Sequence, residues 1–230
     1  MNKRAQVACA WAGFFGIALT LVALIVADFL PPPAAGDSAE ELAAFYQDNA
    51  DRIRAGAFLG VIAQGGFGAL IAVAWVQLRD LQTRRPVLAV LQGIAGAVTY
   101  VALLMTFTAI GVASFRPERS PETTQLMHDL AWFCLLFTVM APATQAVAAG
   151  LAILGDTSGK AVFPRWLGYL GVWAGISFVP GVALIFFKDG LFAYEGVVPF
   201  WIPLLAFGGW VSALSWGCWR AALAEPGPAT

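Results

Sequence analysis

Charged residues are scarce in this chain of 230 residues: 12% are Asp, Glu, Lys or Arg, whereas 60% are hydrophobic. Soluble domains contain about 25% charged residues, so an ordinary soluble domain is excluded. The formal net charge is -1. Disordered chains contain few apolar residues, and nucleic-acid-binding proteins have a basic surface. The composition and the charge exclude both classes, so we expect no nucleic-acid partner. The composition indicates a protein of the lipid bilayer.

Histidine and cysteine are also rare, with one His and three Cys in the chain. A single histidine cannot supply a bis-histidine haem, a histidine-rich di-iron site or a multi-histidine zinc site. Cys9, Cys134 and Cys218 all lie inside apolar runs, which is typical of small buried hydrophobic side chains. Phosphate-binding Gly-rich loops, nucleophile elbows and Cys-x-x-Cys pairs are missing as well. We therefore expect neither a metal nor a cofactor.

Six long stretches without a charged residue or histidine are present. A helix needs about 20 mostly apolar residues to cross a hydrocarbon core about 30 Å thick. The stretches are Ala5–Ala27, Ala55–Leu78, Pro86–Phe115, Leu130–Gly155, Trp166–Phe187 and Gly196–Trp219. The first is longer than the apolar region of a signal peptide, which has about 7 to 15 residues. The sequence predicts an all-α, polytopic membrane helix bundle of six transmembrane helices, with residues 1–230 forming one domain.

The positive residues of the loops predict the orientation, because Lys and Arg concentrate on the cytoplasmic side. With a cytoplasmic N-terminus, eight of them fall on that side and five on the outer side. The first set is Lys3, Arg4, Arg79, Arg84, Arg85, Lys160, Arg165 and Arg220, and the second is Arg52, Arg54, Arg116, Arg119 and Lys188. We expect both termini in the cytoplasm.

The longest loop, residues 31–54, contains an outer amphipathic segment. Three prolines from Pro31 stop the first helix and should extend the chain away from the membrane. Ser38 and Glu41 then have the spacing of a capping box, and Leu42, Phe45, Tyr46 and Ile53 share one helical face. The predicted helix either rests on the outer surface and leads into the second span, or forms a lid over an outward-facing cavity.

Small residues recur every fourth position in several spans, which lets helix backbones approach closely within a bilayer. The repeats are Ala8, Ala12, Gly16 and Thr20, then Gly56, Gly60, Gln64, Gly68 and Ala72; the fifth span carries Gly168, Gly171 and Gly175. These stripes predict close helix packing and no particular chemistry.

Neutral polar side chains within the spans are the candidate ligand-binding residues, because an unsatisfied polar group in hydrocarbon is costly. Intervals of seven place Gln92, Thr99 and Thr106 on one face of the third span, with Tyr100 adjacent, and the fourth span carries Thr138 and Gln145 beside Pro142. The second span adds Gln64. Either these residues line a shared polar cavity, or each forms a hydrogen bond between helices worth about 1 kcal/mol.

His128 and Asp129 are the candidate catalytic pair, near the outer end of the fourth span. A histidine beside a carboxylate can shuttle a proton. Adjacent helical residues point about 100° apart, however, which favours a salt bridge of this region with Arg116 or Arg119. No acidic residue lies in the middle of a span, so the parts of a proton relay are missing.

Two stretches carry a family resemblance: residues 45–52, FYQDNADR, before the second span, and residues 163–169, FPRWLGY, with 187–190, FKDG, around the fifth. They resemble uncharacterised six-helix integral membrane proteins of bacteria across most of the chain. The resemblance implies the same topology and a bacterial plasma (inner) membrane. No activity is known for the group, so it implies no functional residues.

Three functions are compatible with these features. The first is a non-enzymatic membrane protein that binds a small apolar or lipid-like molecule, or is an accessory subunit packed against a membrane-protein partner or a second copy of itself. The second is a transporter or channel for a small neutral solute. The third is a membrane enzyme that acts on a lipid or isoprenoid through His128 and Asp129. In each case membrane lipid surrounds the chain.

Overall fold

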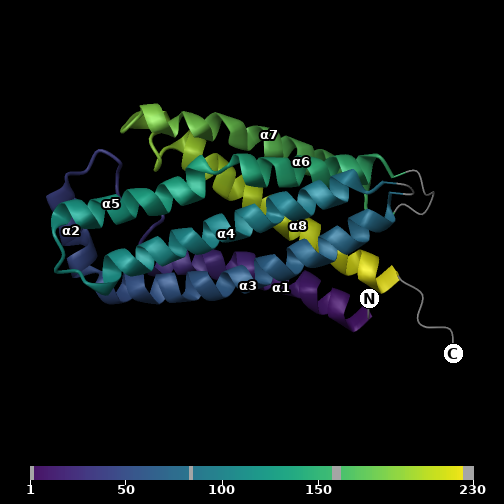
Figure 1. Cartoon of the computed structure of the whole chain (residues 1–230), viewed down its shortest axis with the longest axis horizontal. Coiled ribbons are helices and arrows are strands. Elements are labelled where there is room, and N and C mark those ends of the chain that lie inside the picture. The colour runs from purple at the N-terminus through teal and green to yellow at the C-terminus, as the bar shows by residue number, and fades with distance from the viewer. Residues whose placement is uncertain (1–2, 83–84, 157–161, 225–230) are drawn as a thin grey trace.

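The computed structural model describes residues 3–82, 85–156 and 162–224, and these residues form a helical bundle without a strand (Figure 1). Arg84 and Lys160, both counted for the orientation, lie outside the described residues. The α-helices are α1 (Lys3–Val26), α2 (Ala39–Asp48), α3 (Ala50–Asp80), α4 (Val87–Phe115), α5 (Pro121–Trp132), α6 (Met140–Leu154), α7 (Arg165–Phe178) and α8 (Ile202–Ala224). Four irregular helical segments connect them: η1 (Phe133–Phe137), η2 (Val179–Phe186), η3 (Gly190–Phe192) and η4 (Val197–Trp201).

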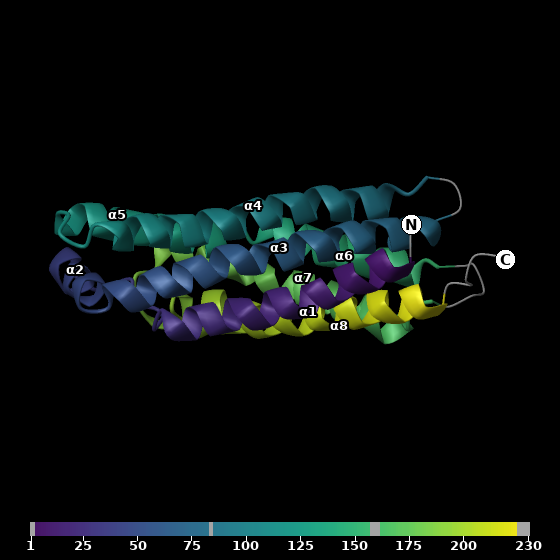
Figure 2. The ribbon, with the colours of Figure 1, turned by 90° about the horizontal axis from the view of Figure 1, so that it is seen from below.

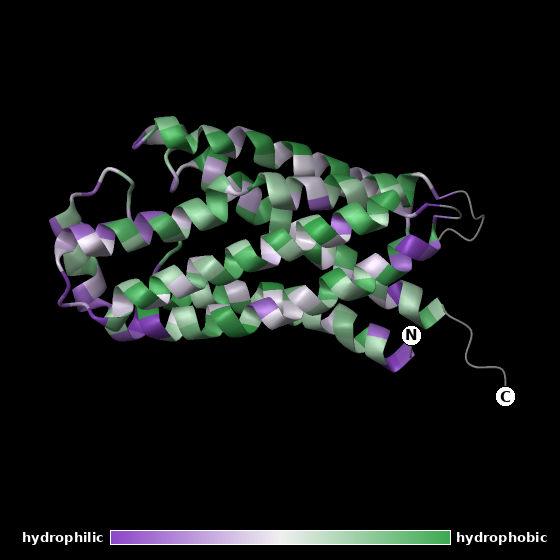
Figure 3. Ribbon diagram, viewed as in Figure 1, coloured by the Kyte–Doolittle hydropathy of each residue, from purple (hydrophilic) through white to green (hydrophobic). Residues whose placement is uncertain are grey.

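Six helical segments of the described chain are long and apolar enough to cross a membrane, which confirms the predicted number of spans. They run over Lys3–Val26, Ala50–Asp80, Val87–Phe115, Pro121–Leu154, Arg165–Phe186 and Gly190–Ala224. Hydrophobic residues follow the length of the bundle and hydrophilic residues gather at its two ends (Figure 3). This distribution matches that of a helical membrane protein.

The spans form a closed ring. Each one packs against the next along the chain, and α8 returns to pack against α1 (Figure 2). Lys3 of α1 donates from Nζ to the carbonyl oxygen of Leu223 in α8 at 2.9 Å, so the two terminal helices begin and end together. We call the end of the bundle where α1 begins and α8 ends the terminal end. The opposite end, where α2 lies, is called the capped end (Figure 1).

The sequence predicts that the prolines after α1 extend the chain away from the membrane. This prediction is wrong, because the segment packs against the bundle. Phe29 and Pro32 are buried, and the backbone N–H of Ala35 donates to Oε2 of Glu195, 3.1 Å away, in the last connection before η4. Apolar side chains such as Phe29 gain more by packing into the capped end than by reaching into water. The segment therefore crosses the end of the bundle before α2 begins.

Helix α2 begins with the predicted capping box. Oγ of Ser38 accepts from the backbone N–H of Glu41 at 3.2 Å, and the Glu41 carboxylate accepts from the backbone N–H of Ser38 at 2.9 Å. Leu42 and Tyr46 on its apolar face are buried, and Phe45 is half-buried. The helix packs on α5 across the end of the bundle, so it lies over the ends of other spans.

The capping box makes α2 sensitive to acid. Its hydrogen bonds to Ser38 hold the pKa of Glu41 below the ordinary value of 4.5. Because the pKa is lowered on folding, the stabilisation is present above that value and is lost as the pH falls through the folded-state pKa. We expect hydrogen exchange of the α2 amides, corrected for intrinsic rates, to accelerate in acid. Ser38→Ala should accelerate this exchange already at pH 7, because the loss of an N-cap costs about 1 kcal/mol of helix stability. The variant should also show a smaller pH dependence of the exchange rate. An exchange rate equal to that of the original chain would contradict the role of the cap.

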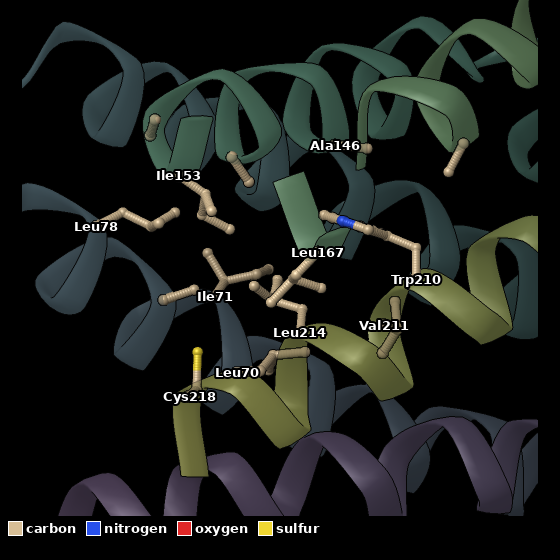
Figure 4. Close-up of a cluster of buried hydrophobic side chains, with 14 of the residues drawn as sticks. Leu70, Ile71, Leu78, Ala146, Ile153, Leu167, Trp210, Val211, Leu214 and Cys218 are labelled. Carbon is tan, nitrogen blue, oxygen red and sulfur yellow. The ribbon is translucent and has the colours of Figure 1, made fainter. Parts of the chain in front are cut away.

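Two clusters of buried apolar residues fill the ring. The terminal-end core includes Leu70 and Ile71 of α3, Ile153 of α6, Leu167 of α7 and Leu214 of α8, whose side chains meet in the middle of the bundle (Figure 4). The capped-end core is mainly aromatic and contains Phe29, Tyr46, Trp132, Tyr194 and Phe200. Together the two clusters leave room for a cavity between them.

Three of the six spans lose regular α-helical geometry at similar depth. The π-helix η1 precedes Pro142, the 3-10 helix η2 begins around Pro180, and the π-helix η4 contains Pro199 and precedes Pro203. Proline has no backbone N–H to continue the hydrogen-bond ladder of a helix. The sequence predicts a loosened backbone at Pro142 for this reason. The segments η1 and η4 both pack against η2. Irregular backbone within a membrane is tolerated where protein buries it or where it lines a cavity.

Candidate functional site: a central cavity

A cavity of about 100 Å³ lies inside the ring, between the two cores. All six spans contribute to its wall, and the irregular segments η1 and η4 supply Cys134, Leu135, Leu136 and Phe200. Five phenylalanines form much of the apolar surface: Phe67, Phe107, Phe178, Phe200 and Phe207. Leu21 of α1 and Thr138 between η1 and α6 are the wall residues that are exposed, while the other wall residues are buried or partly buried.

Four neutral polar side chains interrupt this apolar wall, and each already donates its hydrogens within the protein. Thr20 donates from Oγ1 to the carbonyl oxygen of Gly16 at 2.9 Å, and Thr99 donates to that of Ala95 at 2.9 Å. Thr138 donates to the carbonyl oxygen of Cys134 at 2.6 Å.

Gln64 is the fourth polar residue of the wall and is 1% exposed. Its Nε2 donates to the carbonyl oxygen of Gly60 at 2.9 Å and, more weakly, to Oγ1 of Thr20 at 3.4 Å. The amide of Gln64 therefore links α3 to α1 at the side of the cavity, and its carbonyl oxygen Oε1 is the part left for a ligand.

The structure brings together three of the seven predicted binding residues. Gln64, Thr99 and Thr138 line the cavity. The four others do not: they are Gln92, Tyr100, Thr106 and Gln145. Thr106 is buried and donates to the carbonyl oxygen of Ala102 at 3.0 Å, and the ring of Tyr100 lies beside Gly68 of α3. An interval of seven drifts around a straight helix by about 20° per heptad, so a shared face does not guarantee a shared cavity.

Gln92 and Gln145 lie closer to the terminal end, buried inside the bundle. Both side-chain polar atoms of Gln92 and Oε1 of Gln145 have no hydrogen-bond partner among the described residues. Nε2 of Gln145 lies 2.9 Å from the position that a Cβ on Gly96 would occupy, so the amide fills the space that this glycine leaves on α4.

The sequence interpretation missed most of the wall. Thr20 appeared only as a member of the small-residue stripe of α1, although its depth and its place one turn after Gly16 were available signals. The contributions of Phe178, Phe200 and Phe207 could not be recognised, because an apolar residue in a membrane helix faces lipid and cavity alike without a change of pattern. Only the ring arrangement identifies them.

His128 lies in the capped-end core and is 0% exposed. The indole Nε1 of Trp132 donates to its Nε2 at 3.0 Å, and its Nδ1 lies 2.9 Å from Oη of Tyr46. Since an indole N–H can only donate, Nε2 carries no proton and the neutral ring donates from Nδ1 to Tyr46. Burial raises the pKa of Tyr46 above its ordinary value, so the phenol stays protonated.

The aromatic cage around His128 joins four parts of the chain. Its ring packs edge-on against Phe29, Tyr46, Trp132 and Tyr194, with centroid distances from 5.6 to 6.0 Å. These residues come from the segment after α1, from α2, from α5 and from the segment before η4. The cage therefore fastens α2 to the ends of the spans, which makes α2 a lid on the bundle.

The expected pairing of this region with arginine is wrong for the described residues. Arg119 donates to the carbonyl oxygen of Val112 at 3.1 Å, and the guanidinium of Arg116 lies over the ring of Phe115. His128 points inward to the cage, while Asp129, one residue later, is only partly buried. The two side chains do not converge on a common target, and both ring nitrogens of His128 are occupied, which fits a structural role.

The fold and its cavity define a class: a polytopic helix bundle whose six candidate membrane spans close into a ring around a small, largely apolar cavity. Comparison of the chain with protein-family models, with curated proteins and with solved structures finds no match. The cavity and the residues around it are therefore the features of this chain that bear on its function.

Proposed function

We propose that this chain is a non-enzymatic protein of the bacterial inner membrane that binds a small apolar or lipid-like molecule in the central cavity. The observation that carries the proposal is the cavity itself, because all six spans supply its wall and three of them lose α-helical geometry beside it. Packed protein interiors contain few voids larger than a water molecule. A void that so many elements surround is a candidate binding site.

The size and chemistry of the wall limit the ligand. Apolar cavities of about 150 Å³ stay dry and take up benzene or xenon. A cavity of about 100 Å³ accepts a smaller compact molecule or a short part of an aliphatic chain. A ligand that enters sideways from the lipid would pass Leu21 or Thr138, the exposed residues of the wall. With the excess of positive residues at the terminal end, both termini would lie in the cytoplasm and the lid α2 outside.

The solute-transport alternative has less support, because it requires a passage from end to end. The terminal-end core closes the ring on one side of the cavity and the aromatic cluster closes it on the other. Gln92 and Gln145, which were predicted to line such a passage, stand outside the cavity. Binding requires no motion of either core.

A photolabelling experiment tests the proposal. A small alkyl diazirine should label residues of the cavity wall when the purified protein is reconstituted in phosphatidylcholine vesicles. Ala102→Leu should abolish most of this labelling, because Ala102 lines the cavity and leucine would fill it. Ala97→Leu is the matched control, since Ala97 is an exposed residue on the same helix α4. Mass spectrometry of digested protein locates the label. Labelling restricted to the outer surface in both variants and in the original chain would refute the proposal.

A further inference from the structure

The polar atoms of the cavity differ in what they offer to a ligand. The hydroxyl hydrogens of Thr20, Thr99 and Thr138 are directed to backbone carbonyl oxygens of their own helices. Both directions of the Gln64 amide nitrogen are also used, by Gly60 and Thr20. What remains on each of these groups is oxygen lone pairs, which only accept.

Two positions of the wall also lack a backbone donor. Pro142 and Pro203 belong to the wall and have no N–H. The thiol of Cys134 is the remaining donor among the side chains of the wall, and a thiol donates weakly. The wall is therefore apolar with isolated hydrogen-bond acceptors, of which Oε1 of Gln64 is the one with no hydrogen bond to the described residues.

We infer that the cavity selects ligands that donate a hydrogen bond, namely small apolar alcohols or the hydroxyl end of a longer lipid alcohol. This inference rests on the proposed function. A hydroxyl group can donate to Oε1 of Gln64 while its hydrocarbon part packs against Phe67 and Phe107. A ketone, aldehyde or ether of the same shape would bring a second acceptor to the amide oxygen and leave both without a donor, which is costly inside protein. An alkane would leave Oε1 unpaired.

Competition among matched molecules tests this selectivity. The protein in phosphatidylcholine vesicles is labelled with a pentanol that carries a diazirine in place of one methylene group. Pentan-2-ol, pentan-2-one and pentane then compete at equal concentrations in the membrane. We expect the alcohol to compete about tenfold better than the ketone or the alkane, the size of one net hydrogen bond. Gln64→Met should remove this advantage, and Gln92→Met, at a buried glutamine outside the cavity, should keep it.

The outcomes separate the two proposals. If the three competitors act equally while the label stays in the cavity, or if the ketone is preferred, the alcohol selectivity is wrong and the binding proposal remains. If neither the alkyl nor the alcohol probe labels the cavity wall, the proposed function fails and the selectivity with it. Gln64→Leu, which also removes Oε1 and has a side chain of similar size, serves as a second variant should Gln64→Met fail to fold. An unchanged alcohol advantage in the variant that folds would overturn the inference.

Discussion

Gly66→Ala is expected to destabilise the bundle by about 1–3 kcal/mol, the typical cost of overpacking a tight interface. Gly66 of α3 faces α1 where the two backbones lie close together. A Cβ at this position would meet the carbonyl oxygen of Ala12 and would lie 3.0 Å from Cα and N of Gly16. All these atoms belong to the backbone of α1, so no side-chain rotation relieves the clash. The two helices would have to separate.

The neighbouring glycine provides the control. Gly65 is exposed, and a Cβ added to it meets nothing within 4 Å. Gly65→Ala should therefore stabilise α3 slightly, by about 0.5–1 kcal/mol of helix propensity. The two variants make the same chemical change one residue apart with opposite expected signs. Titration with sodium dodecyl sulfate in mixed micelles, followed by tryptophan fluorescence, measures both. Equal stability of the two variants would contradict the close contact of α1 and α3.

The same contact sets the geometry of the cavity. Gly16, Ile17, Thr20 and Leu21 of α1 all line it. The 3.4 Å separation of Thr20 Oγ1 and Gln64 Nε2 depends on how closely α1 approaches α3. A Gly66→Ala protein that remains folded should therefore also bind the alkyl diazirine differently, whereas Gly65→Ala should not.

The number and approximate positions of the spans could be predicted from the sequence because the physics is local. A charge-free run such as Pro86–Phe115 leaves a helix as the main way to satisfy its backbone in lipid, and the structure has Val87–Phe115. The capping box of Ser38 and Glu41 and the broken helix before Pro142 likewise depend on a few neighbouring residues. Each of these features was predicted correctly.

The cavity could be predicted only in part, because its wall depends on which helices are neighbours. A four-residue repeat of small residues identified Gly56 and Gly60 but missed Gly66, which lies off the repeat and makes the closer backbone contact with α1. His128 was placed at an interface with water because it is polar and near a helix end. Partners in α2 and α5 bury it instead, and no periodicity in the chain reveals a partner 82 residues away such as Tyr46.

His128→Ala is expected to be the second strongly destabilising change, with a loss of roughly 3–5 kcal/mol. Removal of the imidazole leaves a void in the capped-end core, and large-to-small changes in a core cost about 2–5 kcal/mol. It also leaves the indole N–H of Trp132, itself 0% exposed, without an acceptor. A buried donor that loses its partner costs about 1–3 kcal/mol. Neighbouring side chains are expected to close part of the void, so the expected loss of stability is smaller than the two costs added together.

Two further variants separate these causes. Leu126→Ala is a truncation on the same helix at an exposed residue and should change stability by less than about 0.5 kcal/mol. His128→Phe keeps an aromatic ring in the cage but removes the acceptor, so it should show the cost of the orphaned Trp132 with little of the cost of the void. Thermal denaturation in detergent, followed by the near-ultraviolet circular dichroism of the aromatic cluster, ranks the four proteins.

The destabilisation caused by His128→Ala should be greatest at α2, because the cage fastens this helix to the spans. In His128→Ala the α2 amides should exchange hydrogen faster, while those of α7, which lies outside the capped-end core, should change little. A lid that loosens would also expose the cavity from the capped end, where Phe200 belongs to both the capped-end core and the cavity wall. If instead His128→Ala leaves both stability and α2 exchange unchanged, the ring is not structural, and a catalytic role for this histidine becomes the better explanation of why it lies in the membrane domain.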